Sequence, residues 1–199
     1  SLGAALAFWH IEQGNLRNIS TEDDMKGSYL GCEYTQDEIE KDLSSIGAKF
    51  KKFSYDELIN ETSELLSNGK AIGWFQGRME FGPRALGGRS ILGDARSPFM
   101  QKNLNLKVKY RESFRPFAPS VLREDVSDWF KIDIDSPYML LVANINNSKK
   151  IEMSEKDKKL FGIDKLNIQR SEIPAVTHVD YSARIQTVTK DFNKPYYDL

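Results

Sequence analysis

Residues 74–92 read Trp74-Phe75-Gln76-Gly77-Arg78-Met79-Glu80-Phe81-Gly82-Pro83-Arg84-Ala85-Leu86-Gly87-Gly88-Arg89-Ser90-Ile91-Leu92. This stretch holds three arginines, four glycines and one proline between apolar ends. Glycine lets backbone N–H groups approach a ligand closely and adopt positive φ. Arginine offers a permanent charge and a planar fork of donors that fits phosphate or carboxylate. We expect a rigid basic loop that seats an anion; the open alternative is a surface loop with ion-paired arginines.

Positive charge is concentrated around this loop. The whole chain has 28 basic and 29 acidic residues and a net charge of −1. Between Arg78 and Arg115, nine basic residues against three acidic ones give +6, which leaves −7 for the rest of the chain. A local positive field on a nearly neutral protein favours a discrete anionic ligand. Nucleic-acid binders are more often basic overall, so nucleic acid is not the expected partner.

Length and composition indicate one substantial folded domain. The chain has 199 residues, of which 40% are apolar and 11% aromatic, enough to supply a core. No apolar run approaches the roughly 20 residues that span a bilayer, and the first residues do not resemble a signal peptide. We therefore expect no membrane partner. The single cysteine, Cys32, cannot form an internal disulfide and fits a reducing, cytoplasmic compartment.

The first residues form a pattern of their own. Residues 2–11 are apolar and rich in small side chains, which predicts a helix that ends near Gly14. Because this pattern starts without a cap, we expect residues 1–15 to be the end of an upstream domain. Residues 16–34, of mixed charge and weak periodicity, are the expected linker. Residues 35–199 are the expected second domain.

Regular helix signals follow. Capping boxes that begin at Thr35 and Ser54 predict helices ending at Gly47 and near Gly69. A serine followed by a proline predicts a further helix over residues 98–108.

Strand patterns alternate with these helices, which makes the chain a mixed α/β protein. Residues 146–170 are polar and lysine-rich, and we expect a loop or a variable helical insertion there. The predicted strands cover residues 48–53, 70–76, 118–122, 138–145 and 184–189.

A second basic segment reads Lys107-Val108-Lys109-Tyr110-Arg111-Glu112-Ser113-Phe114-Arg115-Pro116-Phe117-Ala118-Pro119. It places four basic residues in nine positions and ends with two prolines, which stiffen the backbone. A stiff segment holds long basic side chains in place at a lower entropic cost. It could face the glycine-rich loop across a pocket, or it could be a solvated basic turn.

A third segment reads Ala175-Val176-Thr177-His178-Val179-Asp180-Tyr181-Ser182-Ala183-Arg184-Ile185-Gln186-Thr187-Val188. His178 is one of two histidines in the chain, and its valine neighbours suit a structural residue as well as a catalytic one. No His or Cys cluster has the spacing of metal ligands, so no metal site is expected. Walker and dinucleotide glycine motifs do not occur, so any nucleotide site must be of another kind.

These three segments resemble the C-terminal domain of the O-carbamoyltransferases, which include nodulation-factor and antibiotic-tailoring enzymes. The resemblance covers residues 73–199 and is dense up to Pro119. It implies a YrdC-like mixed twisted sheet with flanking helices, plus an N-terminal helix left over from an upstream domain. It further implies that this domain binds ATP and carbamoyl phosphate and forms carbamoyl-adenylate.

The same resemblance implies a larger, actin-like N-terminal domain that holds a metal and transfers the carbamoyl group to a hydroxyl acceptor. Members of the family usually continue beyond the position of Leu199 with a strand and an asparagine-containing motif. We therefore expect this chain not to complete a carbamoyl transfer by itself. ATP is the expected nucleotide, accompanied by Mg²⁺.

Site residues follow from charge and from the resemblance together. Arg84, Lys109 and Arg115 are the expected anion clamp, and His178 is a further catalytic candidate. Glu80 is expected to orient an arginine or to hold Mg²⁺ through water, with a structural ion pair as the alternative. The outer phosphate- and nucleotide-binding set is Arg78, Arg89, Arg111 and Arg184.

Two other functions remain open at this stage. The domain could be a non-catalytic module whose basic concavity binds RNA or a partner protein, in which case binding should weaken steeply with salt. It could also be a scaffold for the upstream domain.

Overall fold

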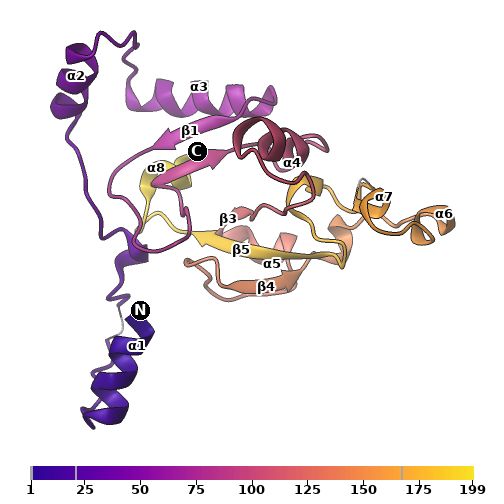
Figure 1. Ribbon diagram of the computed structural model, residues 1–199, viewed down its shortest axis with the longest axis horizontal. Helices are drawn as coiled ribbons and strands as arrows, with labels where there is room; N and C mark the ends of the chain where they lie inside the picture. Colours follow the sequence, from indigo (N-terminus) through magenta and orange to yellow (C-terminus); the bar gives the residue numbers. More distant parts are fainter. Residues whose placement is uncertain (1, 21, 167) are drawn as a thin grey trace.

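Two small β-sheets with helices around them form the body of this α/β protein (Figure 1). The computed structural model describes residues 2–20, 22–166 and 168–199. The segments 1–15, 16–34 and 146–170 of the sequence analysis each contain one residue, Ser1, Thr21 or Asn167, that lies outside the described residues.

The first sheet is an antiparallel pair of β1 (Ile72–Phe75) and β2 (Arg89–Leu92). β1 confirms the strand predicted over residues 70–76. The basic loop was expected to extend through Arg89, but that residue lies on β2 and pairs with Phe75. Residues 89–92, which follow Gly87 and Gly88, therefore form a strand, because they pair with β1 through backbone hydrogen bonds.

The second sheet has the strand order β3-β5-β4. β5 (Ser182–Val188) runs parallel to β3 (Ser120–Leu122) and antiparallel to β4 (Leu141–Asn144). The three predicted strands are confirmed, and β5 begins two residues earlier than predicted, at Ser182. β5 alternates its side chains, so Ala183 and Ile185 enter the core while Arg184 and Gln186 face the other side.

The main core lies on the Ala183 side of this sheet. Val126 of α5 (Val126–Trp129) and Phe130 pack there with Ile145 and Ile185, all four at most 1% exposed. Short helical turns connect the surrounding segments: η4 (Arg123–Asp125), η5 (Asn147–Lys149) and η6 (Pro174–Val176).

Both predicted capping boxes are present. The Thr35 side chain caps α2 (Gln36–Ser45), and the Ser54 side chain caps α3 (Tyr55–Ser67), which lies along β1 (Figure 1). The strand predicted over residues 48–53 is wrong, because this segment is an irregular connection between the two helices. Its alternating pattern has no neighbouring strand to pair with in the described part of the chain.

The helix predicted over residues 98–108 is present but differs in its start and its winding. α4 (Met100–Asn103) is followed by a π-helical turn, η3 (Leu104–Val108). Ser97 does not cap it, because the N-cap residue is Phe99 and Ser97 lies in the preceding turn, where its carbonyl accepts the N–H of Met100.

The N-terminal helix α1 (Leu2–Ala7) continues into the π-helical turn η1 (Phe8–Glu12) and projects away from the sheets (Figure 1). The chain then reaches η2 (Lys26–Ser28) and packs against the basic loop. The N–H of Phe81 donates to the carbonyl of Ser28, and the N–H of Gly31 donates to the carbonyl of Met79. Part of the segment expected to be a linker thus packs against the basic loop. The division into domains remains a prediction.

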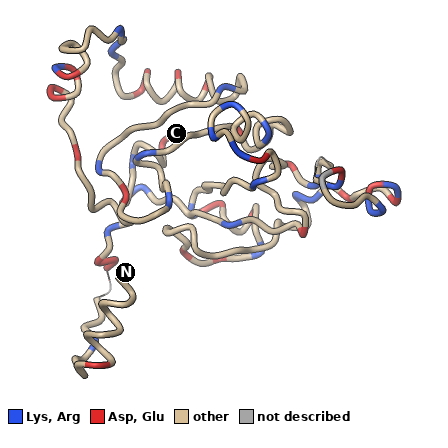
Figure 2. The backbone as a smooth tube through the Cα atoms, in the orientation of Figure 1, with Lys and Arg blue, Asp and Glu red and all other residues tan. Residues whose placement is uncertain are grey.

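The insertion over residues 146–170 carries α6 (Glu155–Lys158) and α7 (Ile163–Leu166) on an arm that projects from the body (Figure 1). Acidic and basic residues are mixed on this arm (Figure 2). At the other end, α8 (Lys194–Asp198) returns to the first sheet. Among the helices of the described residues, none has both the length and the apolar character needed to cross a bilayer.

Candidate functional site

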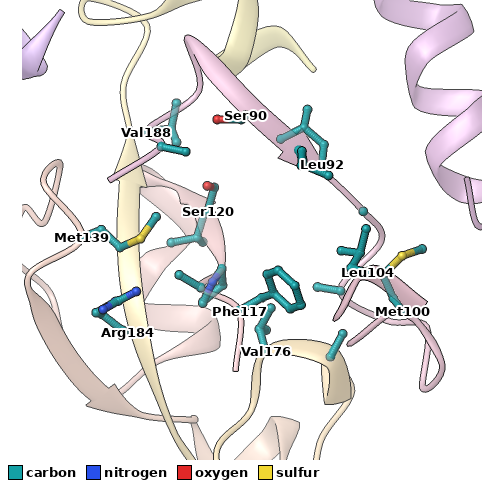
Figure 3. Close-up of a pocket in the computed structure, with 18 of the residues that line it drawn as sticks. Ser90, Leu92, Met100, Leu104, Phe117, Ser120, Met139, Val176, Arg184 and Val188 are labelled. Carbon is teal, nitrogen blue, oxygen red and sulfur yellow. The ribbon is translucent and has the colours of Figure 1, made fainter. Parts of the chain in front are cut away.

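A cavity of about 700 Å³ lies between the two sheets (Figure 3). Ser90 and Leu92 reach it from β2, and Ser120 from β3. Arg184 and Val188 line it from β5. This volume falls within the usual range for small-molecule sites, about 300–1,000 Å³.

One part of the cavity wall is apolar. Met100 of α4 and Leu104 of η3 lie beside Phe117 and Val176 (Figure 3). Such a wall suits an uncharged flat group of a ligand, while polar groups elsewhere in the cavity fix its orientation.

Four cationic side chains line the same cavity: Arg84, Lys109, Arg111 and Arg184. They come from three segments that are far apart in the sequence. Within the described residues, none of the four forms an ion pair. The acidic side chain of the lining, Asp198, already pairs with Lys194 and accepts a hydrogen bond from Tyr55. The cavity therefore carries uncompensated positive charge.

Two of the other arginines predicted at the site are occupied elsewhere. Arg115 pairs with Glu112 at 2.9 Å, and Arg78 pairs with Glu33 at 3.3 Å, both on the surface. Neither lines the cavity. Arg84 and Lys109 of the expected anion clamp thus line one cavity, together with Arg111 and Arg184 of the expected outer set, whereas Arg115 lies outside the lining.

Arg89 also lies outside the cavity lining. Its guanidinium stacks on the ring of Phe75 at 3.4 Å and donates to the carbonyls of Gln76 at 3.1 Å and Gly77 at 3.0 Å. Through these contacts the Arg89 side chain, at the end of the basic loop, holds the backbone at the start of the loop.

Arg184 is a partly buried cation of the cavity lining. Burial, followed by the positive charge of Arg84, lowers the pKa of Arg184 from its ordinary value. Its Nε is buried and has no hydrogen-bond partner among the described residues. Two like charges and an unsatisfied donor at one place favour the binding of an anion between them.

Glu80 organises the basic loop through its backbone. This residue is 7% exposed, and its Oε1 accepts N–H groups from Leu86 at 2.7 Å, Gly88 at 2.7 Å and Arg89 at 3.1 Å. Burial raises the pKa of Glu80, but these backbone hydrogen bonds outweigh burial and hold the pKa below its ordinary value. Among the contacts of the described residues, Glu80 has backbone donors in place of the expected arginine side chain.

Other segments fix the same loop from outside. The carbonyl of Leu86 accepts the Tyr29 hydroxyl at 2.5 Å and Nε2 of Gln186 at 2.7 Å. The carbonyl of Gly87 accepts Nδ2 of Asn193 at 3.2 Å. Sequence reasoning missed these anchors, because their contacts join residues that are up to 106 positions apart.

His178 lies four residues before β5 begins, in an irregular segment, and it is not part of the cavity lining. The hydroxyl of Ser182 donates to Asp180 at 2.7 Å, so its oxygen is left to accept Nδ1–H of His178 at 2.9 Å. This arrangement leaves Nε2 as the acceptor of the ring. Burial lowers the pKa of His178, with a smaller upward effect of Asp180 and a downward effect of Arg184.

The fold and the cavity define an α/β protein with a cavity between its two sheets that is lined by arginine and lysine side chains. The chain belongs to the carbamoyltransferase family, because residues 63–199 match the family model described as Carbamoyltransferase C-terminus. The resemblance drawn from its three motifs is thereby confirmed.

Known proteins of this family share its sequence over a large part of the chain. An uncharacterized protein of Synechocystis is 52% identical over 100% of this chain and 33% of its own length. Nodulation protein NolNO of Sinorhizobium fredii is 35% identical over 100% of the chain and 26% of its own length. The 3'-hydroxymethylcephem-O-carbamoyltransferase of Streptomyces clavuligerus is 38% identical over 69% of the chain and 22% of its own length. The chain thus spans a third or less of the length of these relatives.

Proposed function

We propose that this chain binds ATP and carbamoyl phosphate in the cavity and joins them into carbamoyl-adenylate. An upstream, metal-holding domain of the same protein would then transfer the carbamoyl group to a hydroxyl acceptor. One observation carries the proposal: four cations without carboxylate partners among the described residues line one cavity in a carbamoyltransferase-family chain.

Charge is the physical reason for this choice of ligands. ATP and carbamoyl phosphate are both anions that repel each other, so bringing them together requires fixed positive charge. In a partly dehydrated cavity such charge acts more strongly than in water. Arg84 and Arg184 would hold one phosphate group, and Lys109 and Arg111 another.

The proposed reaction consumes ATP, carbamoyl phosphate and one water, and releases pyrophosphate and phosphate. Water displaces the phosphate group of carbamoyl phosphate to give carbamate. A carbamate oxygen then bonds to the α-phosphorus of ATP, and the bond from that phosphorus to the bridging oxygen breaks, so that pyrophosphate leaves. Catalysis of this kind depends mainly on positioning and charge. For His178 we propose a supporting role, in which Nε2 takes up the proton that is released when water attacks carbamoyl phosphate.

Mg²⁺ is expected to accompany ATP. Among the described residues, no group of three or more potential ligands is placed to hold a metal ion. Glu80 already accepts three backbone N–H groups through one oxygen. The residues present do not fit a protein-held Mg²⁺, so the ion would be carried by the triphosphate itself.

The test is pyrophosphate release from ATP that depends on carbamoyl phosphate. Arg84→Ala and Lys109→Ala should each lower the rate about tenfold or more, because each removes one charge-assisted phosphate contact. Arg115→Ala is the matched control and should leave the rate within twofold, since that side chain pairs with Glu112 outside the cavity.

Full activity of both cavity variants would exclude this assignment of the cations. Binding of RNA in place of ATP, with a steep loss of affinity as salt rises, would identify the alternative binding module. We also propose a cytoplasmic location, which the exposed free thiol of Cys32 supports.

A further inference from the structure

We propose that Asn105 is a positioning residue that holds the Arg111 guanidinium at the wall of the cavity. This inference rests on the proposed function, since it concerns how that cavity binds its anions. Neither charge patterning nor the family motifs point to Asn105, which sits in the π-helical turn η3. π-Helical turns are rare and occur frequently at functional sites.

Asn105 is 0% exposed, and its side-chain amide uses both of its ends. Nδ2 donates to the carbonyls of Ser113 at 3.1 Å and Arg115 at 2.8 Å. Oδ1 accepts Nε of Arg111 at 2.6 Å. A buried amide is costly unless its hydrogen bonds are made, and here three are made to one short segment of chain.

The backbone of Arg111 is tied to the same residue. Its N–H donates to the carbonyl of Asn105 at 3.0 Å, and the preceding Tyr110 adopts a positive φ of 48°. A single residue in η3 thus fixes both the main chain and the side chain of Arg111. On the other side, the Arg111 guanidinium lies over the Phe117 ring at 4.9 Å.

These contacts define which donors of Arg111 remain for a ligand. Arginine has five N–H donors, and the bond to Asn105 uses the one on Nε. The four N–H groups on Nη1 and Nη2 remain, and Arg111 lines the cavity without an ion pair among the described residues. Restricting the guanidinium before the ligand arrives lowers the entropic cost of binding.

A purely structural role would need only the two bonds from Nδ2 to carbonyls. The third bond is to a charged side chain of the cavity, and this bond can be tested separately. If Asn105 acts through Arg111, then removing Asn105 should have no further effect on ligand affinity once Arg111 is absent.

The experiment measures ATP affinity by calorimetry for the wild type, Asn105→Ala, Arg111→Ala and the double variant. Both single variants should weaken binding about tenfold, the effect of one charge-assisted contact. The double variant should differ from Arg111→Ala by less than twofold. Asn103→Ala, at an exposed asparagine two positions away, is the matched control and should bind as the wild type.

A second variant covers the case in which Asn105→Ala does not fold. Arg111→Lys keeps the positive charge but loses Nε, and it should bind ATP as weakly as Arg111→Ala. Wild-type affinity in Arg111→Lys, or in a folded Asn105→Ala, would overturn the inference, as would additive losses in the double variant. Absence of ATP binding by the wild type would instead overturn the proposed function.

Discussion

Replacing Arg184 by methionine should move ligand affinity and protein stability in opposite directions. Arg184 is partly buried on β5, and its Nε has no partner among the described residues. Burial and the charge of Arg84 both lower its pKa, so its charged form is held at a cost in the free protein. Methionine is similar in length and fills the same space without charge.

Magnitudes follow from these contacts. A buried unsatisfied donor costs about 1–3 kcal/mol. Removing the donor should recover this free energy, and the altered packing of the new side chain should offset part of it. We expect Arg184→Met to raise the free energy of unfolding by about 1 kcal/mol, which corresponds to about 2–4 °C in melting temperature for a chain of this size. Loss of a charge-assisted phosphate contact should weaken ATP binding about tenfold or more.

Both quantities can be measured on the same samples, by urea denaturation without ligand and by calorimetric titration with ATP. Arg123→Met is a suitable control, because Arg123 pairs with Asp133 and Asp135 away from the cavity. That control should not raise stability and should leave ATP affinity unchanged. If Arg184→Met destabilises the free protein while affinity is kept, then Arg184 is a structural residue and the electrostatic reasoning is refuted.

Two further predictions concern the basic loop. Glu80→Gln should lower the free energy of unfolding at pH 7 by about 1–3 kcal/mol. Because folding lowers the pKa of Glu80, the stabilisation by its carboxylate is complete above pH 4.5 and is lost as the pH falls through the pKa of the folded state. The denaturation curves of the variant and the wild type should therefore converge in acid. In chemical denaturation, Gly87→Ala should destabilise the protein by about 1–3 kcal/mol more than the control Gly69→Ala. Both glycines have a positive φ, but a Cβ at Gly87 would meet the Tyr196 ring at 2.2 Å, whereas a Cβ at Gly69 would face open space.

Local signals in the sequence were sufficient for the two capped helices but not for every strand. The capping boxes at Thr35 and Ser54 predict α2 and α3 correctly, because both ends of each box lie within one turn. Strand formation needs a partner elsewhere in the chain. Residues 48–53 alternate like a strand without one, whereas residues 89–92 become β2 because β1 lies beside them.

The candidate site shows the same limit. Sequence spacing alone could have indicated the surface ion pair of Arg115, because Glu112 lies three residues earlier. The role of Glu80 as a backbone anchor could not be read in this way, since its partners depend on how the loop folds back. Asn105 carries no charge and belongs to no motif, so only the folded chain reveals its contact with Arg111.

The arginines differ in whether a carboxylate pairs with them, and this difference identifies the cavity residues better than the density of arginines in the sequence does. Between Arg78 and Arg115 the chain concentrates positive charge, yet both of these terminal arginines are neutralised by nearby glutamates on the surface. Arg184 belongs to another segment 69 positions beyond Arg115, and it reaches the cavity because β5 pairs with β3. A cation that is desolvated but given no carboxylate lowers stability, and a bound anion would offset that cost. By this criterion we place the proposed anion site between the two sheets, where Arg84 of the basic loop and Arg184 of β5 line one cavity.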